Sequence, residues 1–188
     1  MLWRLLALSV VPGFFLSTLW MVIPGWMYAL AVLAAVTQLA AVFIFLREWF
    51  SKKLFPNIKP IAKYCMLLSL SAVTLKFMLQ LLSCIPPFSI YAFGYRPLVI
   101  AFLHLVLLGF VSLFILGYFF QSGLVPVNGW NKKGIYVFTA GIVLNEVLLI
   151  LQGLGAIAYI SIPYTNEILW CIAIIMLSGV FMLNRRSA

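Results

Sequence analysis

Three ionisable side chains lie inside long apolar stretches of this sequence: Lys76, His104 and Glu146. His104 is the only histidine, and the stretch YRPLVIAFLHLVLLGFVSLFILGYFF around it contains no charged residue after Arg96. A charged side chain at the centre of a bilayer costs about 3 kcal/mol on insertion scales, so such groups face protein and pair with one another. These residue types offer proton transfer, ligand binding by the imidazole, or ion pairing between helices.

Polar residues recur at helical spacing around Lys76. Ser69, Lys76 and Ser83 are seven residues apart, and Gln80 lies one turn beyond Lys76. At about 3.6 residues per turn, these four side chains share one face of a helix whose other positions are mostly apolar. The spacing predicts that this face is turned toward the inside of a helical bundle.

The same pattern surrounds Glu146. Thr139, Glu146 and Gly153 are again seven residues apart, and Asn145 and Gln152 form the adjacent row of the same helix. We expect Glu146 to lie at a depth similar to those of Lys76 and His104. An ion pair between Lys76 and Glu146, with His104 nearby, is one hypothesis. The alternative is that all these polar groups, Gln80, Asn145 and Gln152 above all, only join neighbouring helices by hydrogen bonds.

The elements that must hold these residues are membrane-spanning helices. Of the 188 residues, 66% are hydrophobic and only 8% are charged, too few for the charged surface of a soluble domain. The apolar runs are continuous rather than alternating, which excludes a transmembrane barrel. We therefore predict an all-α polytopic transmembrane bundle of about six spans, forming a single integral membrane domain over residues 1–188. The predicted spans are residues 5–21, 27–46, 64–85, 98–119, 136–159 and 168–183.

The first predicted span is the least regular of the six. Pro12 and Gly13 interrupt it, and a proline inside a helix removes a backbone donor and bends the axis. Arg4 precedes the apolar stretch, as it would in a secretory signal peptide, but no small-residue cleavage pattern follows. We expect a retained helix.

Basic residues indicate how these spans are oriented. Lys and Arg concentrate in cytoplasmic segments during insertion, and with six spans both termini lie on one side. Ten of the twelve basic residues fall on that side, whereas the opposite side receives Arg96 alone. We predict a bacterial inner-membrane protein with cytoplasmic termini, and the net charge of +9 does not indicate nucleic-acid binding. The ten residues are Arg4, Arg47, Lys52, Lys53, Lys59, Lys63, Lys132, Lys133, Arg185 and Arg186. All six tryptophans fall at predicted span boundaries, as amphipathic indoles prefer.

The sequence lacks the residues that several common catalytic and metal-binding sites require. Asp is absent, and three Glu with one His cannot build a metal quartet or a Ser-His-Asp triad. No phosphate-binding loop or C-x-x-C motif occurs. No self-contained catalytic or metal site is expected. Cys84 and Cys171 are both placed near the outer boundary, so a disulfide between them is allowed in an oxidising compartment.

The stretch around His104 resembles a segment of bacterial membrane proteins related to subunit I of the haem-copper oxidases and to the NnrS family. The matching positions are Arg96, Pro97, His104, Gly109 and Gly117. In those families, histidines on the spans bind haem or copper. The resemblance implies that this chain corresponds to a C-terminal half, with His104 as the one residue that can be carried over as a haem or metal ligand.

The ligand count limits what this resemblance implies. A dinuclear oxygen-reducing site needs several histidines, and this chain has one. The first functional expectation is a haem- or metal-associated redox component, with a second copy or another membrane subunit completing the site. The alternatives are a small transporter or channel subunit with a polar path along Lys76, Gln80, Glu146 and Gln152, or a structural or assembly subunit without a site.

Overall fold

The computed structural model describes residues 2–52 and 57–183, without the side chains of residues 2–5 and 52. Predictions made for six residues fall outside this description. They concern the boundary position of Trp3 and the cytoplasmic positions of Arg4, Lys52, Lys53, Arg185 and Arg186.

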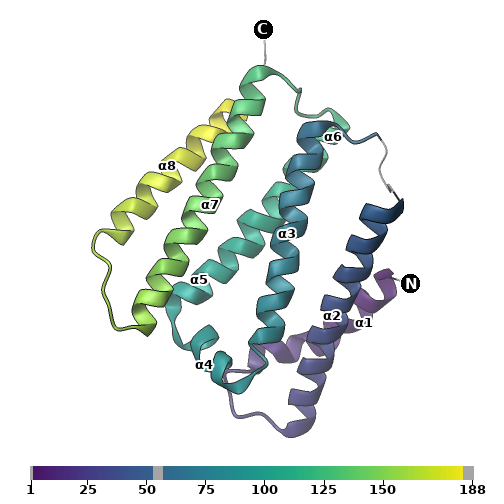
Figure 1. Ribbon diagram of the computed structural model, residues 1–188, viewed down its shortest axis with the longest axis vertical. Coiled ribbons are helices and arrows are strands. Elements are labelled where there is room, and N and C mark those ends of the chain that lie inside the picture. The colour runs from purple at the N-terminus through teal and green to yellow at the C-terminus, as the bar shows by residue number, and fades with distance from the viewer. Residues whose placement is uncertain (1, 53–56, 184–188) are drawn as a thin grey trace. The chain divides into compact units, whose positions relative to one another are not determined.

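Within the described ranges every regular element is helical, and five helical segments are long and apolar enough to cross a membrane. Figure 1 shows them as long rods joined by short connections. This confirms the predicted all-α membrane fold, and the last five predicted spans each lie on one of these segments. Their bounds are α2 (Gly25–Lys52), α3 (Pro60–Leu82), the continuous path Arg96–Ser122, α7 (Gly129–Ile157) and α8 (Thr165–Leu183).

The first predicted span, Leu5–Met21, differs from this expectation. Helix α1 (Leu2–Gly13) contains Pro12 and ends one residue later, and a 3-10 segment, η1 (Phe14–Thr18), follows. Its apolar helical stretch, Leu6–Thr18, is shorter than the other five. At about 1.5 Å per residue it falls short of the roughly 30 Å hydrocarbon core. The first segment is therefore a broken, short helix rather than one long span.

The fourth predicted span is also not a uniform helix. It consists of α5 (Arg96–His104), a π-helical segment η2 (Leu105–Ser112) and α6 (Leu113–Ser122). A further helix, α4 (Pro86–Gly94), occupies a connection that the sequence predicted to be a loop. Proline suits the first turn of a helix because its missing N–H would be unpaired there in any case.

Contacts between residues divide the chain into two compact units. The first unit contains residues 1–57 and 73–94, and the second contains residues 58–72 and 95–188. In the first unit α1 and η1 pack on α2, where Ala31, Ala34 and Ala35 are almost completely buried beside Leu16 and Cys84. Small side chains let these helices approach closely, as the alanine-rich sequence of α2 predicted. The single integral domain stays a prediction.

The core of the second unit is centred on α7. Its residues Ile135, Phe138 and Ile142 pack with buried residues of α3 and α6 such as Cys65 and Phe120. On another side α7 lies along α8, and the two helices run side by side in Figure 1. α7 therefore contacts most of the other helices of its unit, which explains why it carries the longest list of buried positions.

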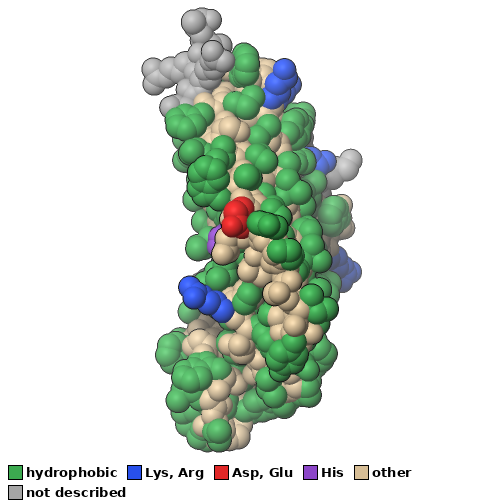
Figure 2. Space-filling model, turned by 90° about the vertical axis from the view of Figure 1, so that its left-hand side faces the viewer, with side chains coloured by type: hydrophobic (Ala, Val, Ile, Leu, Met, Phe, Trp, Pro, Cys, Tyr) green, Lys and Arg blue, Asp and Glu red, His purple; other side chains and the backbone are tan. Residues whose placement is uncertain are grey.

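The described surface is dominated by apolar side chains. Leu107, Phe114, Leu144 and Phe181 are each about half exposed or more. On the face drawn in Figure 2, the few charged side chains are separated from one another by hydrophobic side chains. Since monomeric soluble proteins rarely expose large apolar patches, these surfaces fit contact with lipid. The chain is accordingly an integral, multi-pass membrane protein.

One basic residue caps a helix in the second unit. The Lys59 ammonium donates a hydrogen bond to the Phe120 carbonyl (2.9 Å), and its backbone N–H donates to Oε1 of Gln121 (3.0 Å). Both acceptors lie in the last turn of α6, where carbonyls lack helical partners and a cation is favoured. We expect Lys59→Met to lower the free energy of unfolding by about 1 kcal/mol. Thermal unfolding in detergent measures this change. Lys63→Met, at an exposed position one turn further along, is the control and should leave the stability nearly unchanged. Equal losses of stability in the two variants would contradict the capping role of Lys59.

Candidate functional site

The polar side chains of α7 from Thr139 to Gln152 lie on or beside its buried face, whereas Lys132 and Lys133 near its start are exposed. Thr139 and Asn145 are buried, and Glu146 and Gln152 are half-buried. Thr139 shares a hydrogen bond with the Tyr64 hydroxyl of α3 (3.0 Å), and the Gln152 amide donates to the Thr165 hydroxyl at the start of α8 (3.4 Å). Thr139 and Gln152 therefore join neighbouring helices by hydrogen bonds. For Gln152, this is the structural alternative that the sequence analysis left open.

Asn145 and Glu146 differ from their neighbours on the helix. The amide nitrogen Nδ2 of Asn145 and the carboxyl oxygen Oε1 of Glu146 are buried and have no hydrogen-bond partner among the protein atoms. A buried polar atom without a partner costs about 1–3 kcal/mol, so native proteins rarely retain one without a water, an ion or a ligand. Because the two residues are neighbours in α7, a water, an ion or a ligand bound beside them would complete their hydrogen bonding.

His104 is the last residue of α5, and its ring is held by its own helix. Nδ1 lies 2.8 Å from the carbonyl oxygen of Ile100, one turn earlier. A carbonyl can only accept, so Nδ1 carries the proton and the other ring nitrogen, Nε2, is left with a free lone pair. That nitrogen can take up a proton or bind a metal.

Packing of α5 on α7 fixes the register between His104 and Glu146. The two helices run antiparallel, and a Cβ at Gly153 of α7 would collide with the Leu98 side chain of α5. His104 lies six residues after Leu98, and Glu146 lies seven residues before Gly153. His104 and Glu146 therefore lie in the same direction from this contact, six and seven residues away on neighbouring helices. The sequence predicted their similar depth but not which helix faced which.

The π-helical segment η2 begins directly after His104, and it was not predicted from the sequence. Within it the Ser112 hydroxyl donates to the Leu107 carbonyl five residues earlier (2.9 Å), and Ser69 of α3 donates to the Phe110 carbonyl (2.9 Å). A Cβ at Gly109 would lie only 3.2 Å from the Cβ of Ala72. π-helical turns occur frequently at functional sites because they loosen the regular bonding of the backbone.

Lys76 and Gln80 belong to the first unit. The Lys76 ammonium lies 4.0 Å above the ring of Phe77, which gives it a cation–π contact, and Oε1 of Gln80 is buried without a partner. Glu146 belongs to the second unit. The ion pair between Lys76 and Glu146 stays a prediction.

All three cysteines carry free thiols in the structure. Cys84 belongs to the first unit and Cys171 to the second, so the disulfide that the sequence allowed between them stays a prediction. Cys84 is buried just beyond α3, and burial raises the pKa of its thiol. Cys171 is exposed. Because only the thiolate reacts, maleimide at neutral pH should label Cys171 well before Cys84 or the buried Cys65. Mass spectrometry should find one rapidly labelled cysteine in the folded protein and three after unfolding in dodecyl sulfate. Equal labelling rates for Cys84 and Cys171 in the folded protein would contradict the fold.

Residues 2–52 and 57–183 offer no group of three or more His, Cys, Asp or Glu that could hold a metal ion. Comparisons of the chain with protein-family models, with curated proteins and with solved structures find no match. The fold and the polar residues thus define a helical, multi-pass membrane protein with a candidate site between α5 and α7. The resemblance to the haem-copper oxidase and NnrS group stays a prediction.

Proposed function

We propose that this protein is a small membrane transporter or channel subunit that passes protons through a site formed by His104 and Glu146. Asn145, next to Glu146, and Gln152, two turns further along α7, are the other polar groups of this helix face. The observation that carries the proposal is the pair of unpartnered buried atoms on Asn145 and Glu146, on the helix that neighbours the one histidine of the chain.

The chemistry required is a single reversible proton transfer. With Nδ1 engaged by the Ile100 carbonyl, the imidazole accepts a proton at Nε2 and becomes a cation. A protonated Glu146 carboxyl gives up that proton, directly or through one water, and the resulting carboxylate stabilises the imidazolium. Release of the proton from the imidazolium to one side of the membrane, followed by reprotonation of Glu146 from the other side, completes the transport of one proton.

The test is proton uptake by liposomes containing the purified protein, measured with a trapped pH-sensitive dye under an imposed potential. Replacing the imidazole by an apolar ring, His104→Phe, should reduce the rate to that of empty liposomes. Tyr118→Phe, at an exposed position of α6, is the matched control and should keep the wild-type rate. Uptake that survives His104→Phe unchanged would remove the histidine from the path.

The free Nε2 of His104 also favours a second candidate, a haem-associated redox component. A histidine whose Nδ1 donates to a backbone carbonyl is oriented for ligation through Nε2. His104 would therefore hold a haem through Nε2, the haem would supply one-electron chemistry, and a further ligand would come from a second copy of the chain or a partner subunit. Purified protein supplemented with haem should then show a Soret band that His104→Ala removes, and absence of any band would exclude this candidate.

We also propose a bacterial inner-membrane location with both termini cytoplasmic. The described basic residues Arg47, Lys63, Lys132 and Lys133 lie near the ends of long apolar helices on the side that this orientation places in the cytoplasm. Lipid is the partner that the exposed apolar side chains support. A reporter enzyme that is active only outside the cytoplasm should be active when it is fused at the connection between α7 and α8.

A further inference from the structure

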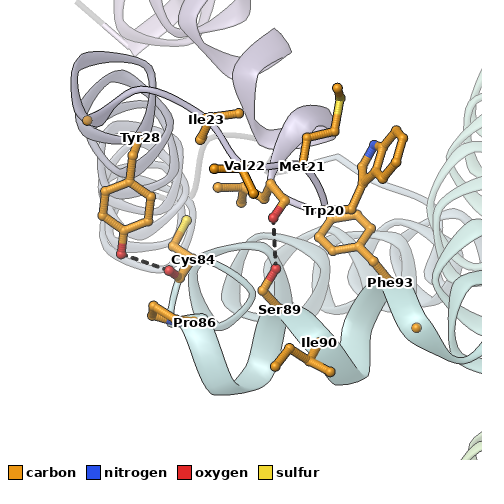
Figure 3. Close-up of a pocket in the computed structure, with 13 residues that line it drawn as sticks. Trp20, Met21, Val22, Ile23, Tyr28, Cys84, Pro86, Ser89, Ile90 and Phe93 are labelled. Carbon is orange, nitrogen blue, oxygen red and sulfur yellow. Dashed lines mark hydrogen bonds between the residues drawn. The ribbon is translucent and has the colours of Figure 1, made fainter.

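The first unit contains a pocket that the proposed proton site does not use. It has a volume of about 770 Å³, within the range of about 300–1,000 Å³ that is usual for small-molecule sites. Its walls are the connection between η1 and α2, the turn after α3, and α4. Figure 3 shows Tyr28 and Cys84 at one end, Ser89 in the middle, and the rings of Trp20 and Phe93 together at the other end.

The lining is apolar and uncharged. No Lys, Arg, Asp, Glu or His lies among its residues, although the whole chain carries a net charge of +9. An anionic or cationic ligand would therefore be desolvated in the pocket without a countercharge, which is strongly unfavourable. The pocket suits a neutral ligand that is largely hydrocarbon.

The two hydroxyls in the pocket narrow the choice of head group. Tyr28 donates its proton to the Cys84 carbonyl (2.9 Å), and Ser89 donates its proton to the Leu19 carbonyl (3.1 Å). Each hydroxyl has only one proton, so in this arrangement both can only accept a further hydrogen bond. They complement a ligand that brings its own donor, and they do not complement a quinone, an ether or an ester, whose oxygens only accept.

The position of the pocket indicates where such a ligand comes from. Trp20 and Trp26 flank the same connection, and both indoles are more than half exposed, as is typical of the level of lipid head groups. Ile90 on α4 and Val22 in the connection are exposed as well, so the rim is apolar. A ligand in the adjacent leaflet can therefore enter the pocket with its hydrocarbon chain in contact with an apolar rim.

We propose that this pocket binds a neutral long-chain alcohol from the adjacent leaflet, with its hydroxyl donating to Tyr28 or Ser89 and its chain lying between α4 and the connection from η1 to α2. The shared chemistry includes fatty alcohols and prenyl alcohols.

The test uses the purified full chain in detergent, a photoreactive diazirine analogue of hexadecanol, and peptide mapping by mass spectrometry. Labelling should saturate, should map to peptides covering residues 19–28 and 84–94, and should be competed by hexadecanol about fivefold better than by methyl hexadecyl ether, the difference expected of one hydrogen bond. Palmitate should compete less well than hexadecanol. Equal competition by alcohol, ether and acid would mean ordinary lipid contact and would overturn the proposal.

Two glycines allow the pocket to be filled without disturbing the fold. A Cβ at Gly94 or at Gly25 meets no atom within 4 Å, and both residues line the pocket. The Leu side chain of Gly94→Leu should block the pocket and reduce saturable labelling about fivefold or more. A fivefold loss is already expected if the ligand loses only one hydrogen bond. Gly25→Leu repeats the test if the first variant does not fold. Gly129→Leu, at the start of α7, also meets open space and should label like the wild type; unchanged labelling in both pocket variants would contradict the site.

Discussion

Glu146→Gln is expected to abolish proton uptake by liposomes while leaving the amount of folded protein unchanged. The amide has nearly the size of the carboxyl and keeps an oxygen at the place of Oε1, which has no partner that the change would orphan. It cannot release or take up a proton at neutral pH, however, so the exchange with His104 stops. General acid–base contacts of this kind contribute about 10²–10⁴-fold to a rate, so the residual uptake should lie at the background.

Glu167→Gln provides the matched control for this change. Glu167 lies in the first turn of α8 and is exposed. It should keep the wild-type uptake, because removing one carboxylate far from the path changes only the surface charge. A loss of uptake in both variants would point to the overall charge of the protein and away from Glu146.

Gly179→Leu is expected to separate α7 from α8 and to prevent stable folding. A Cβ at Gly179 would lie 2.8 Å from the Phe138 nitrogen and 2.9 Å from the Gly134 carbonyl oxygen. Both are backbone atoms, which cannot move without moving the whole of α7. We expect a loss of about 3 kcal/mol or more, the upper end for overpacked interiors.

The measurement for Gly179→Leu is the melting temperature in detergent together with the elution profile of a fluorescent fusion. Gly129→Leu places the same side chain at the open start of α7 and should melt like the wild type. An intermediate case is Gly141→Leu, whose nearest neighbour is the flexible Met176 side chain, so part of the clash can relax. Equal melting temperatures for Gly179→Leu and Gly129→Leu would mean that α7 and α8 do not touch at this point.

Composition and hydropathy predicted the helical membrane fold and five of the six spans because a membrane helix is defined by its own length and apolarity. The same reasoning was less successful for the first segment. Pro12 and Gly13 were recognised as an interruption, but the resulting helix ends at Gly13 instead of continuing to Met21. Helix α4 was not predicted, although its first two residues are prolines, which are favoured in the first turn of a helix.

Side-chain spacing predicted which residues of α7 turn inward, since a helix face depends only on its 3.6-residue period. It could not predict which helix each face meets. Gly134 and Gly179 form a backbone contact that the sequence reasoning missed, although recurring glycines on α7 were the available signal. The π-helical turns after His104 were not predicted, and in the structure Gly109 within them packs closely against Ala72 of α3.

The resemblance around His104 directed attention to the histidine, and the geometry added what the resemblance could not supply. The bond from Nδ1 to Ile100 fixes the tautomer, and the contact of Leu98 with Gly153 shows that α5 and α7 are neighbours. Both features depend on tertiary structure and are invisible in a single sequence.

The central claim, that His104 and Glu146 act as one site, is tested most directly by a double-mutant cycle on thermal stability in detergent. The four proteins are the wild type, His104→Ala, Glu146→Gln and the double variant. If the two side chains interact, the changes in free energy of unfolding will depart from additivity by about 0.5–3 kcal/mol. Effects that add to within about 0.3 kcal/mol would show two independent residues and would contradict the proposed site.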